Sequence, residues 1–228
     1  MTTILITGAN RGIGFHLARE ALEKGWRVYG SVRTDAQADE TTAELGSGFT
    51  PLVFDVTDHA AVSTAAASLE DPIDILINNA GAIGPPDEDQ TTLNMDFGGF
   101  ARTLEINTLA PLAVAQAFLP RIRKSENGRI LTVSSQMSWM GYAKSDRIAY
   151  RASKAAVNKV MQGLATDLAS EGITVCLIDP GWVQTDMGGP TANLTPTEVA
   201  RGIINVADGL TLARTGQFIE WTGREREF

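Results

Sequence analysis

The chain has 228 residues and a formal net charge of −8 at pH 7, with 43% hydrophobic and 20% charged residues. This length and composition are typical of a soluble globular protein with a substantial core. The acidic balance argues against a nucleic-acid partner, because binding to a phosphate backbone requires a basic face. The single cysteine, Cys176, excludes an internal disulfide, and the only histidines, His16 and His59, stand apart from it and from each other, so we expect no metal site.

No apolar run approaches the roughly 20 residues needed to cross a membrane. A strand pattern begins at Thr3, so we expect no leader peptide and no membrane partner. The expected location is the cytoplasm.

Short apolar runs alternate with longer alanine-rich amphipathic stretches along the whole chain. Strands are expected at 3–7, 27–32, 50–55, 73–78, 128–134, 174–179 and 216–221. Helices are expected near 12–24, 36–45, 58–69, 91–122, 150–171 and 196–209. This order predicts an α/β fold, with residues 1–228 forming a single Rossmann-like domain. Its doubly wound parallel sheet has about seven strands, and helices cover both faces.

A glycine-rich turn separates the first strand from the first helix, in "TGANRGIG" (7–14). Glycines let the backbone approach a pyrophosphate closely, and the start of the helix supplies free N–H groups and a positive dipole. The alternative is a glycine-rich turn that holds no ligand. We expect this turn to bind a dinucleotide through Gly8, Asn10, Arg11, Gly12, Ile13 and Gly14.

The end of the second strand distinguishes the two nicotinamide cofactors. Arg33 follows Val32 where a protein that prefers NAD(H) is expected to carry an acidic residue. Together with Arg11 in the glycine turn, its guanidinium suits recognition of a 2′-phosphate. The sequence therefore predicts NADP(H) over NAD(H), unless both arginines are merely solvated or Asp35 reaches the ribose.

The catalytic candidates follow the fifth strand. Tyr150 and Lys154 are four residues apart, so they share one face of a helix. Taken alone, the pair is equally well an aromatic side chain beside a solvated charge. Asn107 is an amide in an otherwise apolar helix, and it is either a satisfied core group or a functional one.

These features occur together with several other motifs. The segments "TGANRGIG" (7–14), "NNAG" (78–81), Asn107, "SS" (134–135), "YRASK" (150–154) and "PGWVQTDM" (180–187) resemble the short-chain dehydrogenase/reductase family, in its order and spacing. The stretch 149–189 and the tail "FIEWTGRE" further resemble its branch of C-factor and sniffer-type carbonyl reductases.

The resemblance implies a role for each catalytic candidate. Tyr150 would act as the acid/base on the carbonyl oxygen, and Lys154 would bind the nicotinamide ribose and lower the pKa of Tyr150. Ser135 would orient the carbonyl group, and Asn107 would hold a water that links Lys154 to solvent. Because the segment before Tyr150 is about two residues longer than is common in the family, Ser138 is a rival for the serine role.

The resemblance also implies cofactor contacts beyond the glycine turn. They would come from Asp55, Val56, Asn79, Ala80, Gly81, Pro180, Gly181, Val183 and Thr185, besides Tyr150 and Lys154 themselves. The loops 81–90, 138–148 and 181–196 would set the substrate, and their aromatic and methionine residues favour a hydrophobic carbonyl compound.

The leading functional hypothesis is an NADP(H)-dependent reductase of aldehydes or ketones that works as a homodimer or homotetramer on a small-molecule substrate. The alternative is a cofactor-binding signalling or regulatory protein of the C-factor type with little or no turnover. A Rossmann methyltransferase is disfavoured, because it would carry an acidic ribose ligand after the second strand and no Tyr/Lys pair.

Overall fold

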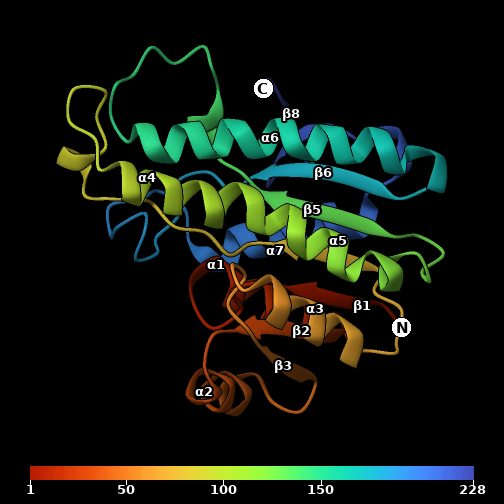
Figure 1. Ribbon diagram of the computed structural model, residues 1–228. Coiled ribbons are helices and arrows are strands. Elements are labelled where there is room, and N and C mark those ends of the chain that lie inside the picture. Colours follow the sequence, from red (N-terminus) through yellow and green to blue (C-terminus); the bar gives the residue numbers. More distant parts are fainter.

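One mixed sheet organises the computed structural model, which describes residues 1–228 (Figure 1). Its strands follow the order β3-β2-β1-β4-β5-β6-β7-β8, and the first seven run parallel. They are β1 (Thr3–Ile6), β2 (Arg27–Val32), β3 (Phe49–Val53), β4 (Ile75–Asn78), β5 (Arg129–Val133), β6 (Thr174–Asp179), β7 (Phe218–Glu220) and β8 (Glu225–Arg226). The predicted doubly wound, Rossmann-like α/β fold is confirmed.

The strand count exceeds the prediction by one, because the chain turns back after β7. Gly223 has φ +90°, a conformation that glycine adopts without strain, and the N–H of Glu220 donates to the carbonyl of Arg224 at 2.7 Å. The two-residue β8 then pairs antiparallel with β7 at the edge of the sheet. So short a strand carries too little pattern to be recognised in the sequence.

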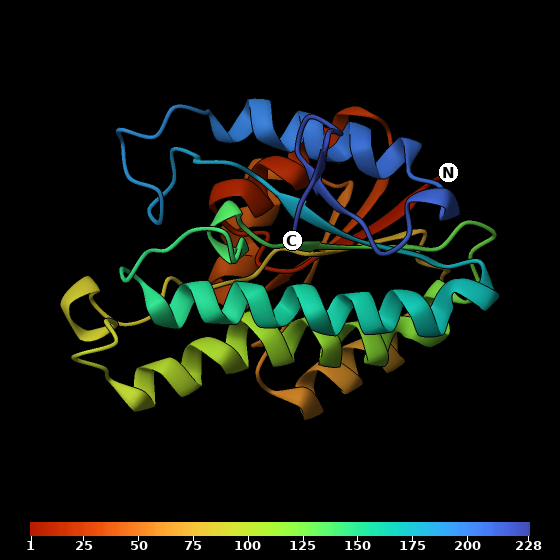
Figure 2. The same cartoon turned by 90° about the horizontal axis from the view of Figure 1, so that it is seen from above.

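Helices cover both faces of the sheet (Figure 2). The helices α1 and α7 lie on one side, α3, α5 and α6 lie on the other, and α2 packs against β3 at the end of the sheet. Their bounds are α1 (Gly12–Glu23), α2 (Asp35–Leu45), α3 (His59–Ser68), α4 (Phe97–Leu104), α5 (Ala110–Ile122), α6 (Ile148–Leu168) and α7 (Pro196–Gly209).

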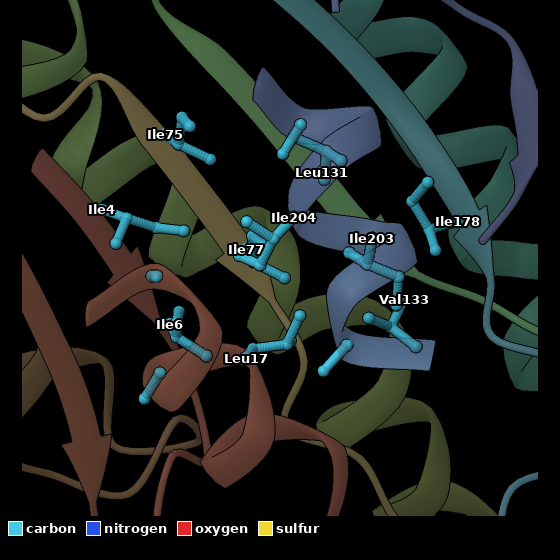
Figure 3. Close-up of a cluster of buried hydrophobic side chains, with 14 of the residues drawn as sticks. Ile4, Ile6, Leu17, Ile75, Ile77, Leu131, Val133, Ile178, Ile203 and Ile204 are labelled. Carbon is cyan, nitrogen blue, oxygen red and sulfur yellow. The ribbon is translucent and has the colours of Figure 1, made fainter. Parts of the chain in front are cut away.

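Alternation along the strands divides the core into two clusters. Ile4 and Ile6 face α1 and α7, and Leu17 of α1 lies beside Ile6 (Figure 3). Leu5, between them, faces the opposite cluster, since successive side chains of a strand point to opposite faces. Because both faces are covered, the strands are apolar on successive residues, and this is why they were recognisable in the sequence.

The long helix expected at 91–122 is interrupted and begins later than predicted. Asp96 caps α4 by accepting the N–H of Gly99 at 2.9 Å, so the helix starts at Phe97. A π-helical turn, Glu105–Leu109, then separates α4 from α5. Pro111 has no N–H to donate to the carbonyl of Asn107 four residues earlier, which explains why regular α-helical bonding fails at this turn.

None of the helices combines the length and the apolar character required to span a bilayer. No group of three or more histidine, cysteine, aspartate or glutamate side chains is arranged to hold a metal ion.

Phe118 tests the contribution of the core beneath α5. Its side chain is fully buried and its ring centroid lies 6.4 Å from that of Phe54. We expect Phe118→Ala to lower the free energy of unfolding by about 3–5 kcal/mol, because it removes buried area and leaves a cavity. Urea denaturation measures this loss. Phe97→Ala is the matched control: that ring is 79% exposed, and its truncation should cost less than about 0.5 kcal/mol.

Candidate active site

The glycine turn between β1 and α1 is packed too tightly for any side chain at its third glycine. A Cβ on Gly14 would lie 2.1 Å from the carbonyl oxygen of Gly8 and 2.5 Å from Nδ2 of Asn79. Gly8 and Gly12 adopt φ values of +68° and +54°, where side chains are strained. No side chain caps the start of α1, so its first N–H groups face outward without a side-chain acceptor. This geometry fits the pyrophosphate of a dinucleotide.

The segment after β4 supports this turn from the side. Nδ2 of Asn79 donates to the carbonyls of Thr7 and Gly8 at 2.9 and 3.2 Å. The Thr7 hydroxyl accepts the N–H groups of Asn79 and Ala80, both at 3.0 Å. The two predicted cofactor segments, 7–14 and 78–81, therefore form one hydrogen-bonded unit.

At the ends of β2 and β3 lie the predicted adenosine-side residues. Oδ1 of Asp55 accepts the N–H and the hydroxyl of Thr57 at 2.9 and 2.7 Å. Burial alone would raise the pKa of Asp55, but these hydrogen bonds, with the charges of Arg102 and Arg33, hold it below its ordinary value. Arg33 is exposed and forms no ion pair, and Val56 packs against the second core cluster.

Arg11, the other predicted phosphate ligand, forms an ion pair within the protein. Nη1 of Arg11 lies 2.5 Å from Oδ2 of Asp186, in the loop after β6. Thr185 of the same loop contacts the position that a Cβ on Gly12 would occupy, at 3.5 Å. The loop after β6 thus lies against the glycine turn. The pair is 65% and 80% exposed, so it is a weak contact that an anion can displace.

On the other side of this edge, α6 presents Tyr150 and Lys154 from one buried face. Nζ of Lys154 donates to the carbonyl of Val133 at 2.8 Å and lies 5.7 Å from the ring centroid of Tyr150. Burial lowers the pKa of Lys154 to about 8.

The pKa of Tyr150 differs from the expected direction. Burial raises it to about 12; a hydrogen bond with the Ser135 side chain and the charge of Arg147 lower it, and the charge of Asp179 raises it further. A lowered value would have required an ammonium close to the phenol oxygen. Lys154 instead directs its ammonium to the Val133 carbonyl, and desolvation prevails.

The two candidate serines have different surroundings. The Ser138 hydroxyl donates to the carbonyl of Ser135 at 2.6 Å and accepts Nδ2 of Asn158 at 2.9 Å, and Ser138 is only 3% exposed. The Ser135 hydroxyl accepts the N–H of Met137 at 3.1 Å, and the Ser135 side chain lowers the pKa of Tyr150. The hydroxyl of Ser138 is therefore occupied by structural hydrogen bonds, whereas Ser135 is the serine that acts on Tyr150.

Asn107 lies in the π-helical turn and is fully hydrogen-bonded by protein groups. Its Oδ1 accepts the N–H of Ala82 at 2.8 Å, and its Nδ2 donates to the Ala82 carbonyl at 2.7 Å and to the Ser153 hydroxyl at 3.0 Å. The side chain joins the segment after β4 to α6. A Cβ on the neighbouring Gly81 would lie 3.2 Å from Oδ1 of Asn107 and 3.7 Å from Nζ of Lys154, so the backbone here closely approaches both groups.

Several residues that position Tyr150 could not be recognised in the sequence. Arg147, just before α6, is the one non-glycine residue with positive φ, at 50°, and forms a double hydrogen bond with Asp87 at 2.9 and 3.1 Å. Gln90 is fully buried; its carbonyl accepts the N–H of Ile148 at 2.9 Å, and its Oε1 accepts that of Tyr150 at 3.4 Å. No local pattern marks these contacts.

Asn158 was also missed, although a signal existed. It lies four residues after Lys154 and eight after Tyr150, so the spacing puts all three on one helix face. Its Oδ1 accepts the Ser134 hydroxyl at 2.6 Å, and its Nδ2 donates to Ser138.

The turn after β6 completes this edge of the sheet. Gly181 has φ +73°, and Pro180 and Val183 are buried. A cavity of about 510 Å³ lies beside the turn, lined by Gln136, Asp179, Gly181, Trp182, Asn193, Leu194, Glu220, Trp221 and Arg226.

The expected apolar pocket wall agrees only in part with this cavity. Trp182 lines it, but Met140 is 82% exposed, and Trp139 packs edge-to-face against Tyr142 with ring centroids 4.8 Å apart. The lining also includes two carboxylates and a guanidinium, which the periodicity of the sequence could not place there.

A doubly wound sheet with a glycine turn and a Ser–Tyr–Lys group on the same edge is the architecture of a dinucleotide-binding protein. The family model for short chain dehydrogenase matches residues 2–194, and the chain belongs to this family. C-signal of Myxococcus xanthus is 41% identical over 162 residues, which cover 68% of this chain and 92% of the relative.

Two solved structures resemble the whole chain. Carbonyl reductase Sniffer of D. melanogaster superposes with a TM-score of 0.93 at 28% identity and covers 100% of both chains. A carbonyl reductase from chicken fatty liver, solved with bound NADPH, has a TM-score of 0.90 at 29% identity and covers 100% of this chain and 99% of that one. The resemblance to the short-chain dehydrogenase/reductase family and to its C-factor and sniffer-type branch is confirmed.

Gly14→Ala tests the tight packing of the glycine turn. The added methyl group must displace the Gly8 carbonyl, so we expect dinucleotide binding to be lost and the free energy of unfolding to fall by about 1–3 kcal/mol. Binding is measured by titration calorimetry and stability by denaturation.

Gly163→Ala is the control for this prediction. It adds the same methyl group to α6 in open space, and it should leave binding intact and stabilise the helix by about 0.5–1 kcal/mol. Unchanged binding in Gly14→Ala would contradict the assignment of the turn.

Proposed function

We propose that the protein is an NADP(H)-dependent oxidoreductase that reduces an aldehyde or ketone to an alcohol, with Tyr150 as the acid/base. The observation that carries this proposal is the buried Tyr150, whose pKa the Ser135 side chain lowers and which is followed on the same helix face by Lys154, on the sheet edge that also bears the glycine turn. The similarity to two carbonyl reductases supports the same reaction class.

The residues of this edge fit a bound NADP(H). The glycine turn and the start of α1 suit the pyrophosphate, while Asp55 and Val56 suit the adenosine. Arg33 carries no competing ion pair, and the exposed pair of Arg11 with Asp186 is weak enough for a 2′-phosphate to replace the carboxylate. The NADPH in the chicken carbonyl reductase supports this choice. When bound, the nicotinamide supplies or accepts the hydride.

Tyr150 has the protonation state that reduction requires. Since burial raises its pKa to about 12, the hydroxyl keeps its proton at neutral pH and can donate it to the carbonyl oxygen as negative charge develops there. Ser135, held by the N–H of Met137, donates a second hydrogen bond to the same oxygen. The engagement of Ser138 with Ser135 and Asn158 favours Ser135 over its rival.

Lys154 acts on the ribose side of Tyr150. With a pKa of about 8, its amine is still mostly protonated at pH 7 and can donate to ribose hydroxyls without losing the Val133 contact. The carbonyl of Asn107, which Pro111 leaves without its usual helical donor, is the acceptor we propose for a water that relays protons from Lys154. The remaining cofactor contacts, from Asn79, Ala80, Gly81, Pro180, Gly181, Val183 and Thr185, follow the family pattern.

We further propose that residues 1–228 act as one domain and assemble as a homodimer or homotetramer in the cytoplasm. The outer faces of α4 and α5 expose Phe97 at 79% and the adjoining Leu109 at 54%, and Gly163 on α6 meets open space. Small and apolar residues on adjoining helices suit a helix-on-helix contact between two copies.

A second candidate function rests on the 41% identity with C-signal. On this hypothesis the chain binds the dinucleotide but acts as a signalling or regulatory protein with little turnover. The two hypotheses separate in one experiment, an NADPH-consumption screen across aldehydes, ketones and quinones, because only the reductase oxidises the cofactor.

Tyr150→Phe tests the acid/base role. It removes only the hydroxyl, so we expect NADPH to bind as in the parent while kcat for carbonyl reduction falls by about 10²–10⁴-fold. Tyr29→Phe is the matched control, since that hydroxyl bonds to Asp71, away from the site. Full turnover by Tyr150→Phe would refute the role.

Arg33→Ala tests the choice between the two cofactors. We expect the Kd for NADPH to rise about 10-fold or more, because a charge-assisted hydrogen bond to the 2′-phosphate is lost, while the Kd for NADH stays the same. Fluorescence titration with both nucleotides measures this. Arg123→Ala, which removes an arginine paired with Glu171, controls for the change in net charge. An equal loss for both nucleotides would contradict the prediction.

A further inference from the structure

We propose that Asp179, the last residue of β6, is a positioning residue of the candidate active site, whose carboxylate ties the serine segment to the turn after β6. This inference deepens the proposed function and rests on it. None of the family motifs in the sequence includes Asp179.

One carboxylate oxygen joins two loops of the site. Oδ1 of Asp179 accepts the N–H of Gln136, the residue after Ser135, at 3.1 Å. It also accepts the N–H of Gly181, in the turn proposed to meet the cofactor, at 3.0 Å. Asp179 is 2% exposed, so water cannot replace it as the acceptor for these groups. The separation between the serine segment and the turn after β6 therefore depends on this oxygen.

The other carboxylate oxygen faces the C-terminal strand. Oδ2 lies 3.0 Å from Nη1 of Arg226 in β8, and the same nitrogen lies 2.9 Å from Oε1 of Glu220. The side chains of Asp179 and Arg226 are 3% and 23% exposed, so solvent screens this pair much less than a surface pair. The added strand β8 thus supplies the counter-ion for the site.

The negative charge of Asp179 is not needed for its two hydrogen bonds. A neutral amide oxygen could accept the same two N–H groups, and a buried carboxylate is costly to desolvate. Burial is the main cause that raises the pKa of Asp179, and it is opposed by the Gly181 N–H, Arg226 and the Gln136 N–H, while the charge of Glu220 raises it further. Burial prevails and the pKa of Asp179 stays above its ordinary value, but these contacts offset part of the cost of ionisation.

Two charges from outside α6 act on the pKa of Tyr150. Asp179 on β6 raises its pKa and Arg147 before α6 lowers it, while Lys154 on the same helix lies 5.7 Å from the ring centroid. Removing the negative charge at position 179 should therefore lower the Tyr150 pKa. Carbonyl reduction needs the protonated phenol, so its loss of rate at alkaline pH should begin at a lower pH; alcohol oxidation needs tyrosinate, so its rise should also begin at a lower pH.

Two variants separate the charge from the hydrogen bonds. Asp179→Asn keeps an acceptor for Gln136 and Gly181, and we expect the Tyr150 titration and both pH profiles to move down by about 0.5–1 pH unit. Asp179→Ala also frees both N–H groups, and we expect kcat to fall about 10- to 100-fold and NADPH binding to weaken, since both loops shift. Glu20→Gln is the control, because it removes a similarly buried carboxylate, paired with Arg201, that touches neither loop.

Two of the measurements on these variants do not require the protein to catalyse a reaction. Tyrosinate absorbance after a rapid pH jump, compared with the same variant carrying Tyr150→Phe, reports the Tyr150 titration, and NADPH fluorescence reports binding. If the parent binds NADPH but reduces no carbonyl, the proposed function fails while these two measurements still test Asp179.

An unchanged Tyr150 titration in folded Asp179→Asn would overturn the electrostatic role. Parent-like kcat and NADPH affinity in Asp179→Ala would overturn the positioning role, as would equal losses in Glu20→Gln. If Asp179→Ala does not fold, Asp179→Asn decides the proposal by its titration, with thermal denaturation as the check on its fold.

Discussion

The polar residues on the buried face of α6 determine how the rest of the site is arranged. A polar group that is shielded from water must find a partner within the protein, and α6 carries four of them against the sheet. Lys154 reaches the Val133 carbonyl of β5, Asn158 joins Ser134 to Ser138, and Ser153 meets Asn107. Each partner belongs to a segment that borders the candidate active site. Hydrogen bonding of these buried polar groups therefore brings the segments of the candidate site together.

The same burial has an electrostatic consequence. It raises the pKa of Tyr150 and lowers that of Lys154, so it favours the neutral form of both residues. A protonated tyrosine is the species that donates to a carbonyl oxygen, and an amine with a pKa near 8 can exchange a proton close to neutral pH. The nearby charges of Asp179 and Arg147 then act on Tyr150 in opposite directions. The pKa of Tyr150 thus depends on residues outside the familiar motif.

The C-terminal strand β8 forms an ion pair with a residue of the candidate active site. β8 adds a single antiparallel ladder to β7, and through Arg226 it neutralises the carboxylate of Asp179. Near this pair lies a cavity whose walls combine tryptophans with charged groups. Family membership defines the reaction class, whereas the side chains of an individual site decide the substrate.

The sequence by itself determined the features that depend on local periodicity and backbone conformation. Apolar runs identified the strands because both sheet faces are covered, glycine spacing identified the turn before α1, and the i,i+4 spacing put Tyr150 and Lys154 on one face. The start of α4 at Phe97 was missed, because the capping by Asp96 and the bonding of Gln90 compete with a helical pattern that runs through both.

Only the tertiary structure decided which groups meet across the sheet. Gln90 and Tyr150 are sixty positions apart, and Asp179 and Gln136 are forty-three apart, so no local pattern could reveal either contact. The raised pKa of Tyr150 also belongs to the tertiary structure, because desolvation depends on everything packed around the phenol. Spacing along a helix shows that two side chains are neighbours, but it does not show whether water or protein surrounds them.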